Sequence, residues 1–166
     1  MMKFLVAIMI LMQVKQVNGL TITEVRNWYQ QAEQKEKACK EMITMLKDYN
    51  EKNHPLYAGY KGCATMMMAK HVINPVSKLS WFIKGRNLLE ASLDNEPLNI
   101  ELRFLRFANQ TNIPSFLGYH SDIEKDKNFL LKSLPQVTDA SLKKKIIAFM
   151  QQSKYVGKNE KKLLHE

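Results

Sequence analysis

Three proline-marked breaks divide the middle of this chain into segments that can each form a helix. They lie at His54-Pro55, Asn74-Pro75 and Asp94-Asn-Glu-Pro97. Proline fits the first turn of a helix but disrupts its interior, so each break ends one helix and lets the next begin. Between the breaks, apolar residues recur close to every 3.6 positions. We therefore predict helices over residues 55 to about 71, 75 to about 93 and 98 to about 110.

Helix-start signals of another kind lie on either side of this middle region. Thr21-Ile-Thr-Glu24 is a capping box, and an apolar period follows it to about residue 50. Ser121-Asp-Ile-Glu124 is a second capping box before a fifth helix, and Thr138 is placed to cap a sixth. No alternating, β-branched run competes with this pattern. We expect an all-α fold of about six helices in an irregular antiparallel bundle with repeat-like helical hairpins, the first helix being the longest.

The first 19 residues have the layout of a cleavable secretory signal peptide. Lys3 precedes an apolar run from Phe4 to Val14, and Val17 and Gly19 are small residues at the −3 and −1 positions of a cleavage site. The run is too short to span a bilayer as a stable helix, although an uncleaved anchor or a buried N-terminal helix stays open as the alternative. We predict a leader at residues 1–19, a single helical domain at 20–153, and a periplasmic or secreted location.

The charge of the chain is concentrated at its C-terminal end. The net charge is +9, and residues 141–166 hold seven Lys against two Glu. This end could contact anionic headgroups, or residues 154–166 could form a solvated, frayed basic tail. Arginine and aromatic residues are missing from the lysine run, so we expect no nucleic-acid partner. No second apolar run is long enough for a transmembrane helix, so no integral membrane segment is expected after cleavage.

Two stretches resemble known helical proteins. The segment from Leu89 to Pro97 looks like the end of a tetratricopeptide-type repeat, although no partner copy recurs about 34 residues away. Glu101-Leu-Arg-Phe-Leu-Arg106, followed by Asn112-Ile-Pro-Ser-Phe-Leu-Gly-Tyr119 and Ile123-Glu-Lys-Asp-Lys-Asn-Phe129, resembles uncharacterised small exported α-helical proteins of Gram-negative bacteria. That resemblance implies a compartment and a fold class but no activity.

Two charged residues fall within predicted apolar faces. Glu101 lies inside the apolar arc of the fourth helix, and Arg86 lies within that of the third. If these helices pair around the break at residues 94–97, the two side chains come within about one turn of each other. We therefore predict a partly buried Arg86–Glu101 ion pair. It would be either a structural bridge that fixes helix register or a polar group in a binding pocket.

The connection over residues 111–120 is unusually apolar for a loop, with Ile113, Phe116 and Leu117 in it. Exposed, it would be a recognition loop; packed down, it would be a lid on the core. Tyr119 and His120 at its end are candidate ligand-facing residues, and together with Arg86 and Glu101 they make up the predicted binding site.

The two cysteines, Cys39 and Cys63, lie on adjacent predicted helices, 14 residues before and 10 residues after Asn53. An antiparallel hairpin would bring them close enough for a disulfide, and two buried free thiols are the alternative. Cys63, Met67 and His71 also follow one another at i, i+4 steps, a soft ligand set that suits copper. Methionine at helical spacing is more often core filler, so we predict neither a metal site nor a cofactor.

Enzyme signatures are absent from the sequence. There is no Gly-x-Ser-x-Gly elbow, no His-Glu-x-x-His and no phosphate-cradling glycine-rich loop. We therefore predict an exported binding or scaffold module whose partner is a protein or another envelope component. The alternative is an exported hydrolase or small-ligand carrier with a pocket near Glu101. A single pocket holding all four candidate residues would favour that alternative, and a groove without convergent polar groups would favour the module.

Overall fold

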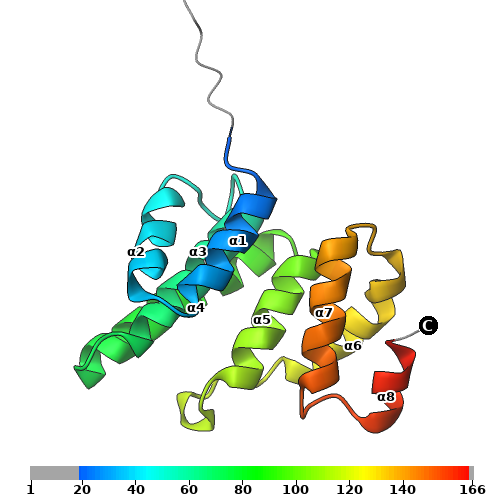
Figure 1. Cartoon of the computed structure of the whole chain (residues 1–166). Helices are drawn as coiled ribbons and strands as arrows, with labels where there is room; N and C mark the ends of the chain where they lie inside the picture. The colour runs from blue at the N-terminus through cyan, green and yellow to red at the C-terminus, as the bar shows by residue number, and fades with distance from the viewer. Residues whose placement is uncertain (1–18, 165–166) are drawn as a thin grey trace, which may run out of the picture.

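The computed structural model describes residues 19–164, which form helices and connecting loops and contain no strand (Figure 1). The predicted leader lies outside this range apart from Gly19. The all-α fold class is confirmed. The described residues form eight α-helices and three short 3₁₀ turns, namely α1 Ile22–Ala32, α2 Glu36–Met45, α3 Pro55–Met67, η1 Met68–Lys70, α4 Pro75–Asn95, α5 Ile100–Asn112, η2 Ser115–Leu117, α6 Ile123–Ser133, η3 Leu134–Gln136, α7 Ala140–Gln152 and α8 Lys158–Leu163.

The structure has eight α-helices where about six were expected, because the predicted first helix is two helices and the predicted tail contains α8. α1 ends at Ala32, and the chain turns through an extended Lys35 before α2 begins. No proline or glycine marks this turn. Ala32 and Cys39 are both completely buried in one apolar cluster. After the turn, α1 and α2 pack against each other, which one continuous helix would not allow, so packing overrides the local helical pattern.

The helix starts at Pro55 and Pro75 are confirmed, whereas α5 begins at Ile100 instead of Leu98 and two predicted caps are not formed. Pro55 and Pro75 each occupy the first turn of a helix, and the Asn74 side chain accepts hydrogen bonds from two backbone N–H groups. The Thr21 capping box is also present. Before α6, however, Ser121 donates to Asp122 and caps nothing, and α7 is capped by Asp139 instead of Thr138.

The closest helix pair is α3 with α4, and glycine makes that approach possible. A Cβ atom on Gly62 would lie 2.8 Å from the carbonyl oxygen of Gly85, and one on Gly85 would lie 2.5 Å from the backbone nitrogen of Met66. Side chains at these two positions would push the helix backbones apart. The two glycines therefore let the backbones of α3 and α4 approach each other directly, whereas side chains separate the backbones in most helix pairs.

Buried apolar residues form two clusters that meet on α5. The first cluster contains residues of α1 to α4 with Leu102 and Leu105 of α5, and the second contains Phe107 of α5 with residues of α6, α7 and the C-terminal end. Figure 1 shows this arrangement, with α5 between the α1–α4 group and the α6–α8 group. We name these the N-terminal and C-terminal clusters.

The predicted frayed tail is instead part of the fold as far as residue 164. Val156 and Leu164 are buried in the C-terminal cluster. Glu160 of α8 accepts from the backbone N–H of Gly157 and forms an ion pair with Lys127 of α6 at 3.0 Å. These apolar anchors fix the segment despite its lysines, because the lysine-rich face of α8 is the one left in water.

No helix among residues 19–164 combines the length and the apolar character needed to cross a membrane. α4 is the longest at 21 residues, and it carries Lys78, Lys84 and Arg86 along its length.

Candidate functional site

Glu101 is buried, but its partner is not the predicted Arg86. Arg26 of α1 donates from Nε and Nη2 to the two Glu101 carboxylate oxygens, each at 2.6 Å. The Tyr60 hydroxyl of α3 donates to Glu101 at 2.5 Å, and Arg26 also reaches Asp139 at the start of α7 at 2.7 Å. We name these four residues the Glu101 cluster. The hydrogen bond to Glu101 raises the pKa of the Arg26 guanidinium above its ordinary value.

Arg86 lies elsewhere on α4, where it is half-buried. Its guanidinium hydrogen-bonds the side chain of Asn87 and lies 5.9 Å from the ring centre of Phe82. The predicted Arg86–Glu101 pair assumed that α4 supplies the cation facing Glu101. α3 lies closely against α4, and α1 brings Arg26 to Glu101 from a position 75 residues earlier in the sequence.

Tyr119 and His120 both turn inward to protein partners. Tyr119 is buried, and its hydroxyl donates to Glu90 of α4. Burial and the charge of Glu90 raise the pKa of Tyr119 well above its ordinary value, so this hydroxyl stays protonated at neutral pH. His120 Nε2 lies 3.0 Å from the carbonyl oxygen of Ile113. The four predicted site residues therefore do not converge on one pocket.

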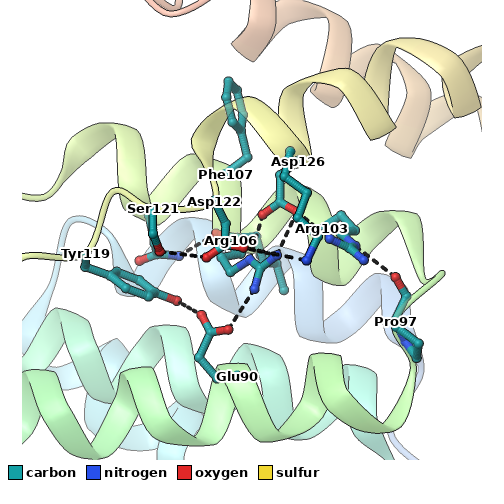
Figure 2. Close-up of polar contacts among 12 residues, drawn as sticks. Glu90, Pro97, Arg103, Arg106, Phe107, Tyr119, Ser121, Asp122 and Asp126 are labelled. Carbon is teal, nitrogen blue, oxygen red and sulfur yellow. Dashed lines mark hydrogen bonds and ion pairs between the residues drawn. The ribbon is translucent and has the colours of Figure 1, made fainter.

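Tyr119 belongs to a second buried polar cluster, shown in Figure 2. Asp126 of α6 is completely buried and accepts from Arg106 at 2.6 Å and from Arg103 at 2.8 Å. Arg106 also donates to Glu90 at 2.7 Å, and Arg103 to the carbonyl oxygen of Pro97 at 2.8 Å. We name this the Asp126 cluster; it joins α4, α5 and α6 and anchors the end of the 111–120 loop.

Both clusters hold helices together. Each buried carboxylate is matched by a guanidinium in hydrogen-bond contact, which is the arrangement that offsets the cost of removing charge from water. Neither Glu101 nor Asp126 lines the large groove described below. These residues fix the orientation of the helices. The Glu101 cluster links α1 to α5 and α7, and the Asp126 cluster links α4 to α6.

The predicted disulfide is not present, since Cys39 and Cys63 are free and completely buried. Cys39 Sγ donates to the carbonyl oxygen of Ala64 at 2.9 Å, and Cys63 Sγ accepts from the Asn109 side chain at 3.2 Å. The break before α2 directs Cys39 to the backbone beside Cys63 instead of to its sulfur. Burial raises the pKa of Cys39 to about 11 and that of Cys63 to about 12.

The soft-ligand series Cys63, Met67 and His71 is not a continuous helical face. α3 ends at Met67 and passes into η1 before His71 is reached. Within residues 19–164, no group of three or more His, Cys, Asp and Glu side chains is placed to hold a metal ion.

An apolar groove of about 820 Å³ lies on the described surface. It is lined by residues of α1, the end of α3, η1, α4, α5 and the 111–120 loop, and by Phe149 of α7. Most of its lining is apolar, including Met66, Met67, Phe82, Phe104, Leu105 and Leu117. A cavity of this size and character lies in the range used by proteins to bind ligands or partner segments. We name it the α4–α5 groove.

The 111–120 loop is partly packed down and partly exposed. The predicted lid and the predicted recognition loop therefore each describe part of it. Ile113 and Leu117 are half-buried and pack against the N-terminal cluster. Phe116 lines the groove but is 84% exposed. Gly118 allows the loop to turn back after η2, because its φ of 64° lies in the left-handed region. The loop therefore packs down through two residues and presents a third to water.

Polar groups in the groove are few, and lysines outnumber carboxylates among the charged ones. Lys70 of η1 and Lys78 of α4 line it, against the single carboxylate of Glu33. Asn109 and Asn112 of α5 supply amide groups, of which Asn109 is already bonded to Cys63 and to the carbonyl oxygen of Leu105.

The first half of α4 carries an apolar stripe beside the groove. Val76, Leu79 and Ile83 lie at i, i+3 and i+7, so they share one helix face, and they are 77%, 47% and 37% exposed. Ile73, just before α4, is 95% exposed. Leu79 belongs to both the stripe and the groove lining. We name Ile73, Val76, Leu79 and Ile83 the α4 stripe.

The 3.6-residue apolar period over residues 75 to about 93 includes Val76 and Leu79 but gives no reason to expect them in water. They are exposed because α3 covers α4 along its Phe82, Gly85 and Leu89 side, while the stripe lies on a neighbouring side. Arg26 and Asp126 carried no sequence signal, since their partners lie 75 and 20 or more residues away. Comparisons of the chain with protein families, with curated proteins and with solved structures find no match.

Proposed function

We propose that this protein is an exported binding module of helical hairpins, and that the α4–α5 groove with the α4 stripe is its binding surface. The proposal keeps the predicted leader and the expected periplasmic or secreted location. Its partner is a protein or another component of the cell envelope.

The observation that carries the proposal is an apolar groove that continues outward as exposed apolar residues. Large side chains such as Phe116 and Val76 are more than three-quarters exposed beside a concave, mostly apolar surface. Proteins rarely leave such a contiguous apolar region in water unless it contacts something else. Covering these residues would remove apolar area from water, which is the main driving force for association.

The alternative of a hydrolase or small-ligand carrier near Glu101 has less support. Arg86, Glu101, Tyr119 and His120 are absent from the groove lining, and Glu101 is enclosed by Arg26 and Tyr60. A small-ligand carrier that uses the α4–α5 groove is a second candidate, favoured by the groove's volume alone.

Site-specific photocrosslinking tests the proposal. A photoreactive phenylalanine analogue replaces Phe116 in the groove, and in a control variant it replaces Leu163 on α8, which is also exposed. After irradiation in cells of the natural source, we expect discrete adducts at position 116 and none at position 163. An adduct of protein mass supports the binding module, and a mass increase of small-molecule size supports the carrier. Absence of any adduct at position 116, or equal adducts at both positions, contradicts a binding role for the groove.

A further inference from the structure

We propose that the occupant of the α4–α5 groove is an amphipathic helix of a partner protein, with an apolar face and acidic residues beside it. This inference rests on the proposed function, because it names the partner of the same surface.

The spacing of the α4 stripe favours a helix as the partner. Side chains at i, i+3 and i+7 form a ridge on α4, and such ridges pack into the grooves between side chains of another helix. Val76 and Ile83 flank the cavity without lining it. A small molecule confined to the cavity would leave both of them in water, whereas a helix lying along α4 would cover them together with Leu79.

The length of the surface matches a short helical segment. Within α4, from Val76 to Ile83, the stripe covers seven residue steps, or about 10 Å at the helical rise. This corresponds to about two turns of a partner helix, and Ile73 extends the apolar surface beyond the start of α4. The apolar lining from Phe82 and Leu105 lies beside the stripe and would receive side chains that point down from that helix.

The charges around the surface favour acidic flanks on the partner. Lys70 and Lys78 line the groove with only Glu33 opposing them. Arg86 follows Ile83 by three positions and so continues the stripe as a cation. Complementary charges at the edge of an interface speed association and select partners.

The same charges disfavour two other occupants. A second copy of the chain would bring the same lysines, Lys70 and Lys78, to the interface, and these would repel the lysines of the first copy. An anionic membrane surface would match the charge, but a flat surface would reach Phe116 and the stripe and would not fill a groove whose floor includes Met66 and Leu105.

Selection from a phage-displayed library of random linear peptides, about 16 residues long so that four turns can form, tests the inference. The purified protein is the target, and the best peptide is then measured by fluorescence anisotropy. We expect enriched peptides with apolar residues at helical spacing and more Asp and Glu than Lys and Arg. Leu79→Asp should weaken binding by about tenfold or more, and Lys78→Glu by about threefold.

The matched control is Leu163→Asp, which changes another exposed leucine in the same way on α8. It should leave the peptide affinity unchanged, and circular dichroism should give the same melting temperature for Leu79→Asp and wild type, because Leu79 is about half exposed. Enrichment of extended or basic peptides, equal binding to Leu79→Asp, or no enrichment overturns the inference.

Two further measurements separate the other occupants. If no acidic helical peptide is selected, either of two results would overturn the helix proposal in favour of another occupant. One is co-sedimentation with phosphatidylglycerol vesicles, and the other is concentration-dependent dimerisation that Leu79→Asp abolishes. If Phe116 crosslinks to a partner while the selected peptides are basic or extended, the groove keeps its proposed function and only the helical, acidic partner is contradicted.

Discussion

Glu101 shows how a buried carboxylate organises its neighbours. Arg26 gives it two hydrogen bonds and Tyr60 a third, and all three residues are buried. Burial and the charge of Glu101 raise the pKa of Tyr60 well above its ordinary value, which keeps its hydroxyl a donor. Because α1, α3 and α5 each supply one member, the three residues fix how those helices meet.

Replacing Glu101 by Gln should destabilise the protein strongly. The amide keeps the volume but leaves the Arg26 charge buried with only the partly exposed Asp139 as an ionised partner. Removing one member of a buried pair costs about 3–5 kcal/mol, so we expect the free energy of unfolding to fall by about 3 kcal/mol in urea denaturation.

The matched control for that substitution is Arg86→Gln. Arg86 hydrogen-bonds the neighbouring Asn87 side chain and lies over Phe82, so we expect a change of about 0.5 kcal/mol or less. Equal losses for Glu101→Gln and Arg86→Gln would instead support the Arg86–Glu101 pair that the sequence suggested.

The two thiols should be unreactive in the folded protein. Burial raises the pKa values of Cys39 and Cys63 to about 11 and 12, from a normal value of 9.0, and the thiolate is the reactive form. At pH 8, we expect almost no reaction with Ellman's reagent in buffer and two thiols per chain in guanidinium chloride.

The same shifts set the direction of the pH dependence. A raised pKa in the folded state means that the contribution of each thiol to stability is complete below pH 9 and is lost as the pH rises toward 11 or 12. Exchanging both cysteines for alanine should therefore reduce the loss of stability between pH 9 and pH 11. A native mass two hydrogens below the reduced mass, with no thiols titrated in guanidinium, would contradict the free-thiol arrangement.

At the scale of elements, the α3–α4 pair depends on two glycines. A Cβ at Gly62 or Gly85 would meet backbone atoms of the opposite helix, which cannot move without separating the pair. We expect Gly85→Ala to lower the free energy of unfolding by about 3 kcal/mol, at the upper end of typical overpacking costs, measured by thermal and urea denaturation.

Gly59→Ala is the control for this effect. A Cβ there would meet the tip of the Leu102 side chain, which can change its rotamer at a cost of about 1 kcal/mol. Alanine favours helix over glycine by about 1 kcal/mol, so we expect Gly59→Ala to leave the free energy of unfolding nearly unchanged. A Gly85→Ala variant as stable as Gly59→Ala would mean that the helices do not approach at backbone distance.

Three helix starts were predicted correctly from local chemistry, namely those at Pro55, Pro75 and the Thr21 capping box, which act within one turn of the chain. Signals of the same local kind failed at Ser121 and Thr138, where Asp122 and Asp139 occupy the cap positions. The turn at Lys35 could not be predicted in this way. It has no breaking residue, and it lets α1 and α2 pack against each other within the N-terminal cluster.

At the scale of the whole molecule, the candidate site could be predicted only in part. The 111–120 loop stood out because it is apolar, and it does line the groove. The other walls come from four helices, and their meeting depends on Arg26 and Asp126, whose partners are remote in sequence. Periodicity identifies which residues are apolar, but it does not identify which apolar face lacks a neighbour.

α5 couples the two halves of the molecule. It contributes Leu102 and Leu105 to the N-terminal cluster and Phe107 to the C-terminal cluster. Arg26 also links α1 directly to Asp139 at the start of α7. One helix shared by two clusters cannot lose its contacts on one side without weakening its position on the other. We therefore expect the chain to unfold in a single transition.

Ile146→Ala tests this coupling, because Ile146 is completely buried in the C-terminal cluster, whereas both tryptophans, Trp28 and Trp81, pack on the N-terminal cluster. The substitution should cost about 2–4 kcal/mol. If the clusters unfold together, the tryptophan fluorescence midpoint should fall as far as the far-ultraviolet circular dichroism midpoint. Leu105→Ala in the N-terminal cluster serves as the control and should shift both signals equally. A tryptophan transition that stays at the wild-type midpoint in Ile146→Ala would show that the two clusters unfold independently.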